Sequence, residues 1–189
     1  MKEKIIEMLH IQEALDKSFM EYMGRTEPLT IEEVQKALYD ECGEVNHAMK
    51  AEWCYWKKSQ KHVDREVVKE ELADVYHFAL SLHRLIYGFE FKYKKIEYSK
   101  FLYRECDWFE VLKDISNADG YELYYTIILT EKLGFTFDEV YEAYMKKNKV
   151  NYERMKEGYV ETRNFQTQRK RTFNLIRAYA IFNLHQNYR

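Results

Sequence analysis

Two stretches decide the fold of this chain: LYDECGEVNHAM at residues 38–49 and EELADVYHFALSL at residues 70–82. Each stretch carries two acids spaced i, i+3, which places both on one face of a helix. The four acids are Glu41, Glu44, Glu71 and Asp74. Glu41 lies among apolar residues of its helix, and Glu71 lies among Val67, Val75, Phe78 and Leu82, whereas Glu44 and Asp74 lie at the borders. We therefore expect four carboxylates to face a core, where unpaired anions are too costly to keep.

A metal ion is the simplest way to offset these charges. One i, i+3 acid pair is common on a solvated helix face, but two pairs within apolar stripes favour metal binding. Oxygen-only ligands indicate Mg²⁺, with Mn²⁺ as a substitute. In enzymes, such hard cations most often act on phosphoryl and diphosphate substrates, where they neutralise charge and activate water. The chain has neither a GxxxxGK[ST] nor a GxGxxG motif, so phosphates would be held by metal ions and Lys or Arg.

The composition indicates an all-α fold. The chain has 189 residues with 46% hydrophobic content, six Gly and one Pro, which is enough for one sizeable core and leaves few turn signals. We expect a helical bundle with the carboxylate metal site between two antiparallel helices. Capping boxes at Thr30 and Thr136 mark two helix starts. The expected helices cover residues 5–24, 31–56, 67–88, 119–133 and 137–156, and residues 89–116 are expected to form a loop followed by a helix.

Charge and cysteine usage limit the partners and the compartment. The formal net charge is −2, but residues 160–189 carry six Lys/Arg and one acid, which leaves about −7 for the preceding residues. An acidic body disfavours nonspecific nucleic-acid binding. The three cysteines include no CxxC spacing, and no segment has the apolar length of a signal or membrane span. We expect a cytoplasmic protein with no membrane partner.

Two further groups of residues have competing interpretations. Lys147, Asn151 and Arg154 share one helix face, where they could hold a phosphate chain and a sugar or could form a solvated helix end. The aromatic residues of EWCYWKK, residues 52–58, could pack in the core, or one ring could stack on a base while Lys57 or Lys58 reaches phosphates.

A rival enzyme class follows from two histidines. Glu44 with His47, and Asp74 with His77, each form an acid-x-x-His step of the kind found in di-iron helical bundles. Such bundles need a further Glu on each of two other helices. The candidates, Glu13 and Glu139, lack the accompanying pattern.

Four blocks in order resemble the all-α dimeric dUTP diphosphatases, relatives of the MazG-like nucleotide pyrophosphohydrolases. The blocks are MLHIQEALD, ECGEVNHAMKAEWCYWKK, EELADVYHFALSL and GFTFDEVYEAYMKKNKVNYERMKEGY, and the resemblance spans about residues 5–159. It implies a MazG-like domain over residues 1–159, followed by a basic C-terminal helix or tail over residues 160–189 to which we assign no role. It also implies a metal site of Glu41, Glu44, Glu71 and Asp74. The implied substrate-binding residues are Gln12, Asp16, Trp56, Lys57, His77, Lys147, Asn148, Asn151, Arg154 and Tyr159.

The implied activity is Mg²⁺-dependent hydrolysis of dUTP to dUMP and diphosphate, with dUDP as a second substrate. Glu41 and Glu44 are the expected catalytic residues, and Glu44 would orient or deprotonate the attacking water. The resemblance further implies a homodimer from a bacterium or a phage in a bacterial host. Three alternatives stay open: another nucleotide such as dCTP, a weakly active protein that binds a regulatory protein, and a di-iron bundle.

Overall fold

The computed structural model describes residues 1–59, 61–117 and 120–157, and all regular structure in these ranges is helical. The all-α prediction is therefore confirmed. Residues Met1–Tyr152 form one compact unit, whose packing is described here. No helix among the described residues is both long and apolar enough to cross a membrane. The helices are α1 (Lys2–Tyr22), α2 (Ile31–Ala48), α3 (Lys50–Trp53), α4 (Arg65–Tyr87), α5 (Lys94–Leu102), α6 (Trp108–Ser116), α7 (Glu122–Lys132) and α8 (Phe137–Glu157).

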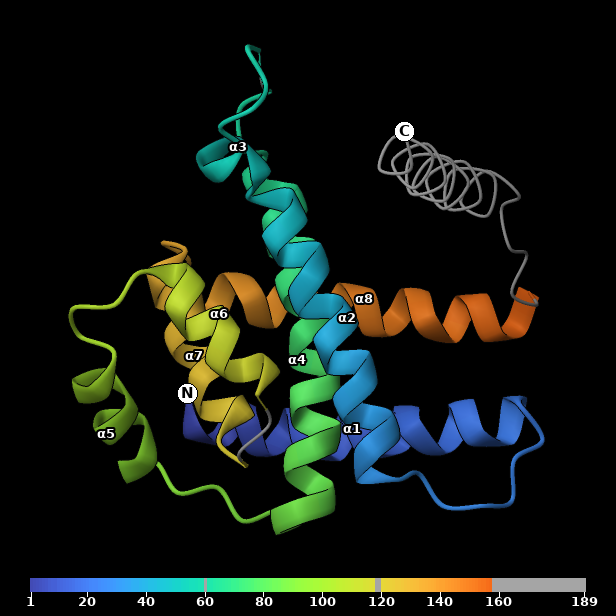
Figure 1. Ribbon diagram of the computed structural model, residues 1–189. Helices are drawn as coiled ribbons and strands as arrows, with labels where there is room; N and C mark the ends of the chain where they lie inside the picture. Colours follow the sequence, from blue (N-terminus) through green and yellow to red (C-terminus); the bar gives the residue numbers. More distant parts are fainter. Residues whose placement is uncertain (60, 118–119, 158–189) are drawn as a thin grey trace, which may run out of the picture. The chain divides into compact units, whose positions relative to one another are not determined.

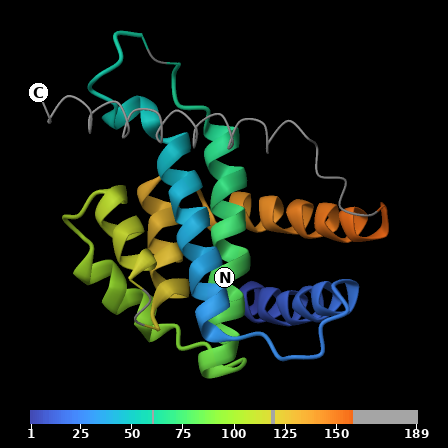
Figure 2. The same cartoon turned by 45° about the vertical axis from the view of Figure 1, so that its right-hand side comes forward.

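An antiparallel pair, α2 and α4, occupies the centre of this unit (Figure 1). Helices α5, α6 and α7 lie on one side of the pair, where α6 packs on α2 and α7 packs on α4. Helices α1 and α8 cross the pair on another face, as both views show (Figure 2). The predicted antiparallel arrangement of the two acid-bearing helices is confirmed.

Side-chain caps define where the central helices begin. Thr30 Oγ1 accepts a hydrogen bond from the Glu33 backbone N–H, while the Glu33 carboxylate accepts one from the Thr30 backbone N–H, which completes the predicted capping box. The same exchange joins Thr136 and Glu139 at the start of α8. Helix α4 begins two residues before the predicted Val67, because the Asp64 side chain accepts from the first backbone N–H groups of the helix.

Two segments differ from the sequence prediction. The helix expected over residues 31–56 ends at Ala48, because Met49 leaves helical geometry and only the four-residue α3 follows. Residues 89–116 contain two helices where one was expected. The second of them, α6, begins at a capping box between Asp107 and Glu110. The predicted helix start at Asp119 lies outside the described residues, as does the predicted domain boundary after residue 159.

The core forms around α4. Its buried side chains include Val68, Leu72, Val75 and Tyr76, each at most 2% exposed. Because α4 packs against α1, α2, α7 and α8, its buried surface is wider than a single stripe. Val67, which the sequence placed in the apolar stripe around Glu71, is instead 41% exposed in the first turn of α4.

Candidate active site

Three carboxylates meet between the central helices. Glu41 projects from α2, and Glu71 and Asp74 project from α4, each offering an oxygen that lies within 4.8 Å of the other two. All three side chains are partly buried. The structure therefore brings together three of the four predicted metal ligands. Three oxygen donors at this separation match the ligand chemistry of Mg²⁺ or Mn²⁺.

Crowding of like charges changes the acidity of this carboxylate trio. Burial, together with the charges of Asp74 and Glu71, raises the pKa of Glu41 to about 7. Burial and the charge of Asp74 also raise the pKa of Glu71. The trio therefore holds protons more tightly than isolated carboxylates do, and a bound cation would relieve that repulsion.

Lys147 supplies the nearest positive charge in the compact unit. Its Nζ from α8 donates to Asp74 Oδ2 at 2.5 Å, and its charge lowers the pKa of both Glu41 and Glu71. Lys147 therefore offsets part of the negative charge of the trio. This residue was predicted to contact phosphates, and the structure places it at the edge of the trio.

Glu44 lies apart from this trio. Its side chain is exposed, so the prediction that all four acids face the core is wrong for Glu44. The reason is its place one turn beyond Glu41, on the border of the buried face of α2. Its charge nevertheless contributes to the raised pKa of Glu71, which places it at the rim of the site.

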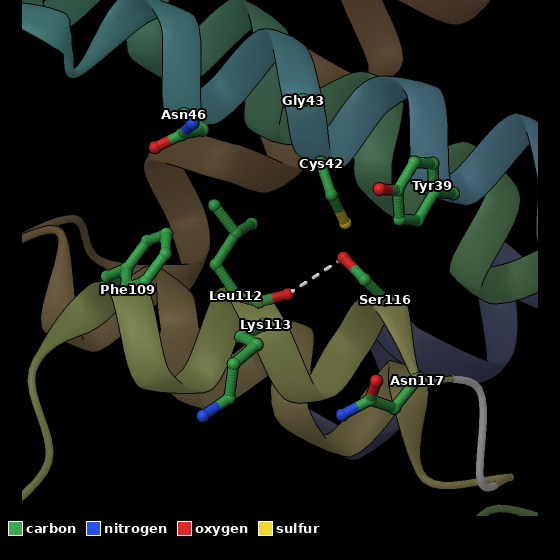
Figure 3. A pocket seen from close by; sticks show the side chains of 9 residues that line it. All are labelled: Tyr39, Cys42, Gly43, Asn46, Phe109, Leu112, Lys113, Ser116 and Asn117. Atoms are coloured by element: carbon green, nitrogen blue, oxygen red, sulfur yellow. Dashed lines mark hydrogen bonds between the residues drawn. The ribbon is translucent and has the colours of Figure 1, made fainter.

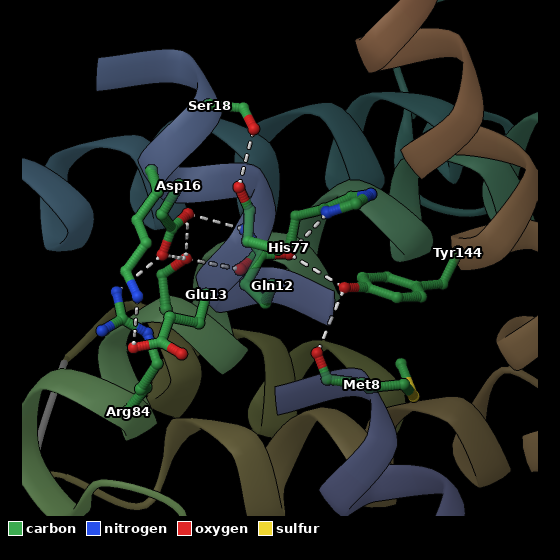
Figure 4. A network of polar contacts seen from close by, with 11 residues as sticks. Met8, Gln12, Glu13, Asp16, Ser18, His77, Arg84 and Tyr144 are labelled. Carbon is green, nitrogen blue, oxygen red and sulfur yellow. Dashed lines mark hydrogen bonds and ion pairs between the residues drawn. The ribbon is translucent and has the colours of Figure 1, made fainter. Parts of the chain in front are cut away.

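A buried polar network lies along α4 beside the trio (Figure 4). Gln12 and Asp16 from α1 contact His77 and Ser81 from α4: Gln12 Oε1 lies 2.8 Å from His77 Nδ1, and Ser81 Oγ donates to both Asp16 oxygens at 2.9 Å. Arg84 pairs with Asp16 at 2.9 Å. Three predicted substrate-binding residues, Gln12, Asp16 and His77, are thus brought together by helix crossing.

Sequence reasoning missed three members of this network, Ser81, Arg84 and Tyr144. Ser81 and Arg84 follow His77 at i+4 and i+7, so all three share one helix face. This spacing is visible in the sequence and could have predicted that they lie together. Tyr144 comes from α8, where its hydroxyl donates to Gln12 Oε1 at 3.1 Å. No spacing rule in the sequence connects Tyr144 to α1.

Three buried polar atoms in this region have no hydrogen-bond partner among the described residues. One is Arg84 Nε, and the other two are His77 Nε2 on α4 and Asn148 Nδ2 on α8, in side chains that are 4% and 7% exposed. His77 and Asn148 both adjoin Tyr144: the His77 and Tyr144 ring centroids lie 4.4 Å apart, and Asn148 follows Tyr144 by one helical turn on α8. Buried polar groups are normally paired, so these atoms are candidates for ligand contacts.

The histidines of the two acid-x-x-His steps are not part of the carboxylate trio. The trio contains no histidine, and Nδ1 of His77 is engaged by Gln12. Burial, followed by the charge of Lys147, lowers the pKa of His77 to about 3, so its ring is neutral. Of the proposed additional ligands, Glu13 pairs with Lys17 and Glu139 caps α8.

The aromatic block follows α2 on an exposed turn. Trp56 is 55% exposed and contacts Trp53 and Tyr55, with their ring centroids 5.6 and 5.2 Å from its own. Lys57 borders a separate pocket of about 420 Å³ that is also lined by His47 and Val67. Trp56 and Lys57 are therefore placed on the surface at the end of α2, and their predicted substrate contacts stay predictions.

The remaining predicted contacts lie on or beyond α8. Asn151 is 9% exposed, one turn after Lys147. Arg154 is exposed in the last turn of the helix and belongs to a second unit, Glu153–Arg189. Tyr159 lies outside the described residues.

A second concave region lies between α2 and α6 (Figure 3). This pocket has a volume of about 370 Å³, and none of the described residues that line it carries a carboxylate. Its thiol, Cys42, is unreactive because burial raises its pKa to about 12. Its Ser116 hydroxyl donates to the Leu112 carbonyl oxygen at 3.1 Å. The pocket therefore offers no nucleophile or metal site.

Comparison with known proteins agrees with this geometry. A search of curated proteins found none that matches the chain. The sequence pattern of a family described as dUTPase matches residues 4–159, which contain every element of the trio and of the polar network. The chain therefore belongs to the all-α dimeric dUTPase family and is an enzyme of the dUTP diphosphatase class.

Proposed function

We propose that this chain is a Mg²⁺-dependent hydrolase that converts dUTP to dUMP and diphosphate. The observation that carries the proposal is the carboxylate trio, Glu41, Glu71 and Asp74, within 4.8 Å on two helices of a dUTPase-family chain. Family membership supports the substrate class, and the donor chemistry of the trio supports the metal.

The trio fits a hard divalent cation. All three donors are carboxylates, and the raised pKa of Glu41 reports the repulsion that a cation would offset. When bound, Mg²⁺ would neutralise phosphate charge and lower the pKa of a coordinated water. Glu44, at the rim, is the proposed fourth ligand and the group that orients or deprotonates the attacking water.

The proposed substrate contacts divide between two regions. Lys147 would exchange its bond to Asp74 for the phosphate chain once a cation occupies the trio, and Asn151 and Arg154 would hold the sugar and phosphates. The base would lie against the network of Gln12, Asp16, His77 and Asn148, where an unpaired acceptor and an unpaired donor adjoin Tyr144. Trp56, Lys57 and Tyr159 complete the proposed contact set.

Family membership supports a proposal for the oligomeric state and the location. We propose a homodimer that acts in the cytoplasm of a bacterium or of a phage-infected bacterium, with dUDP as a second substrate. A regulatory protein could contact the basic residues 160–189. Pull-down with the full chain and with a chain truncated after Tyr159 would test this contact. Equal recovery of the partner by both chains would exclude that segment as the contact.

The decisive experiment compares two adjacent glutamates on α4. Glu71→Gln removes a member of the trio, whereas Glu70→Gln changes an exposed acid that pairs with Lys146 at 3.4 Å. With dUTP and Mg²⁺, Glu71→Gln should lower kcat/KM by at least roughly 10–100-fold, the range seen when metal-site partners are removed. Glu70→Gln should stay within about twofold, in the range of surface changes.

The readout is release of dUMP and diphosphate, with EDTA as the metal control and dCTP, dTTP, UTP and dUDP as competing substrates. Near-normal activity of Glu71→Gln, or equal activity in EDTA, would refute the metal mechanism. Preferential cleavage of dCTP would leave the metal site in place and reassign the base.

A further inference from the structure

A groove of two adjoining hollows is formed by α2, α3 and α6. The first hollow is the pocket of about 370 Å³ between α2 and α6, and the second has a volume of about 470 Å³. Asn46 from α2 and Phe109 from α6 line both hollows, and Figure 3 shows the two side chains at the same end of the first one. We name the two hollows together the α2–α6 groove. The second hollow is also lined by Glu52, Trp53, Asp107 and Trp108.

Hydrogen bonds hold the aromatic rings of the second hollow in place. Trp108 Nε1 donates to Glu52 Oε2 at 3.1 Å, which joins α6 to α3. Trp53 Nε1 donates to the Asn46 carbonyl oxygen at 3.0 Å. The Trp108 and Phe109 rings meet edge to face, with centroids 5.8 Å apart and planes at 81°. The second hollow is therefore a preformed aromatic corner whose two indole N–H groups already have acceptors.

The second hollow is acidic as well as aromatic. Its lining includes the exposed carboxylates of Glu52 and Asp107, and no Lys or Arg is among the described residues that line it. Each carboxylate is anchored through one oxygen: Glu52 Oε2 accepts from Trp108, and Asp107 Oδ1 accepts from the Phe109 and Glu110 backbone N–H groups. A carboxylate has two acceptor oxygens, so each acid has a second oxygen with which to bind a ligand.

Aromatic rings beside carboxylate oxygens suit a guanidinium group. A cation is attracted to the face of an aromatic ring. A planar guanidinium can stack on a ring while its N–H groups bond a carboxylate, which a compact ammonium cannot do in the same way. Trp53 already attracts a cation on this surface: Lys50 Nζ lies 5.7 Å from its ring centroid, although Lys50 lines the separate pocket of Lys57.

The first hollow indicates that the guanidinium belongs to a polypeptide. Its lining includes Cys42 and Leu112, each 3% exposed, and Tyr39, which is 67% exposed. Lys113 also lines it, so the negative charge of the groove is confined to the second hollow. An apolar residue next to an arginine would cover these side chains, whereas a free guanidinium compound would leave them uncovered. Exposed apolar side chains that gather in a groove are typical of surfaces that partner proteins cover.

We propose that the α2–α6 groove docks an extended segment of a partner protein in which an arginine stands beside an apolar residue. The arginine guanidinium stacks on the indole rings of the second hollow and bonds the second oxygens of Glu52 and Asp107. The apolar neighbour lies in the first hollow, against Leu112 and Tyr39. Charge complementarity selects arginine at one end of the groove, and the apolar lining selects its neighbour at the other.

The α2–α6 groove and the carboxylate trio use different faces of α2. Tyr39, Gly43 and Asn46 line the groove at spacings i, i+4 and i+7, so they share one helix face. Glu41 lies two residues from both Tyr39 and Gly43, which is about 200° around the helix axis. Docking in the groove is therefore a property separate from the proposed hydrolysis.

The test is a peptide titration of the full chain followed by ¹H–¹⁵N NMR. The chain has three tryptophans and therefore three indole N–H signals, which Trp53→Phe and Trp108→Phe assign. The probes are acetyl-Leu-Arg-Leu-amide, its glutamine counterpart acetyl-Leu-Gln-Leu-amide, and agmatine as a free guanidinium compound. No nucleotide is present, so the result does not depend on the proposed hydrolysis.

Two variants remove one charge each from the second hollow. Glu52→Gln keeps an oxygen that accepts from Trp108, and Asp107→Asn keeps a good helix N-cap, so both variants should fold as the wild type does. The matched control is Glu105→Gln, an exposed acid outside the groove that pairs with Arg104 at 2.8 Å. Circular dichroism checks the helical content of all three.

The arginine peptide should shift the Trp53 and Trp108 signals saturably, and it should bind more tightly than agmatine or the glutamine peptide. Glu52→Gln and Asp107→Asn should each raise its Kd at least about threefold, the scale of an exposed ion pair. Glu105→Gln should stay within about twofold of wild type, as expected for a surface change.

Three results would overturn the proposal. Equal binding of the glutamine peptide, or an unchanged Kd in both charge variants, would exclude recognition of a guanidinium. Agmatine that binds as tightly as the arginine peptide would exclude a polypeptide partner and leave a site for a small organic cation. An arginine peptide that shifts neither the Trp53 nor the Trp108 signal would exclude docking in the α2–α6 groove.

Discussion

Glu41 shows how burial and neighbouring charge act on a single residue. Its pKa of about 7 results first from burial and then from Asp74 and Glu71, with Lys147 acting in the opposite direction. In the unfolded chain the same group would titrate near its ordinary value of 4.5. The folded protein without metal therefore binds this proton more tightly than the unfolded chain does.

This difference predicts a pH-dependent stability in EDTA. The contribution of Glu41 is fully present below about pH 4.5 and is lost as the pH rises through about 7, and the raised pKa of Glu71 acts in the same direction. The Tm should therefore fall between pH 5.5 and pH 8, and Glu41→Gln should reduce that fall. Added Mg²⁺ should raise the Tm more at pH 8 than at pH 5.5, because only the deprotonated trio binds metal.

Thermal unfolding followed by circular dichroism tests both parts. An equally steep fall in Glu41→Gln would show that the titration lies elsewhere in the protein. A Mg²⁺ effect that is larger at pH 5.5 would contradict the assignment of the trio as the metal site.

At the scale of single elements, α2 depends on a cap outside the active site. Thr30 and Glu33 exchange hydrogen bonds, and Arg25 holds the Glu33 carboxylate with two further bonds of 2.8 and 2.9 Å. The trio needs Glu41 at a fixed register on α2. The cap at Thr30 therefore supports the site from eleven residues away.

Thr30→Ala should lower the free energy of unfolding by about 1 kcal/mol, the usual cost of losing a helix cap. Urea denaturation measures this change. The matched control is Thr26→Ala, an exposed threonine in the preceding loop, which should stay within about 0.5 kcal/mol of wild type. Equal values for the two variants would show that the capping box contributes nothing to α2.

Local signals explain which elements could be predicted. The sequence predicts the capping boxes at Thr30 and Thr136, and both are present; an equivalent box at Asp107 and Glu110 marks the start of α6. Helix α5 has no side-chain cap, so its start carried no such signal. Helix α2 ends at Met49 without a Gly or Pro next to it, so the residues around Met49 still predicted a continuous helix.

At the scale of the whole molecule, α4 is the helix on which the other layers meet. Leu72 is fully buried there and Val67 is 41% exposed, although both are aliphatic residues within five positions of each other. Leu72→Ala should cost about 2–5 kcal/mol through loss of apolar burial and formation of a cavity. Val67→Ala should change stability by no more than about 0.5 kcal/mol.

Urea unfolding monitored by tryptophan fluorescence and by circular dichroism compares the two variants. A single transition, shifted only in Leu72→Ala, is expected because the core around α4 is shared by several helices. A comparable loss in Val67→Ala would mean that the first turn of α4 is buried in solution, as the helical periodicity alone suggested.

The sequence by itself determined the helical class, the two acid-bearing helices and their antiparallel pairing, because local spacing and caps encode these features. It also selected four acids, three of which the structure brings together as the trio, since acids within or beside an apolar stripe are rare. Only the tertiary structure decided that Glu44 lies at the exposed rim and that Val67 faces solvent. It likewise joined Tyr144 and Arg84 to Gln12 and Asp16. The physical reason is that helix periodicity fixes the direction of a side chain around its own axis, whereas the crossing of α1, α4 and α8 decides which side chains meet.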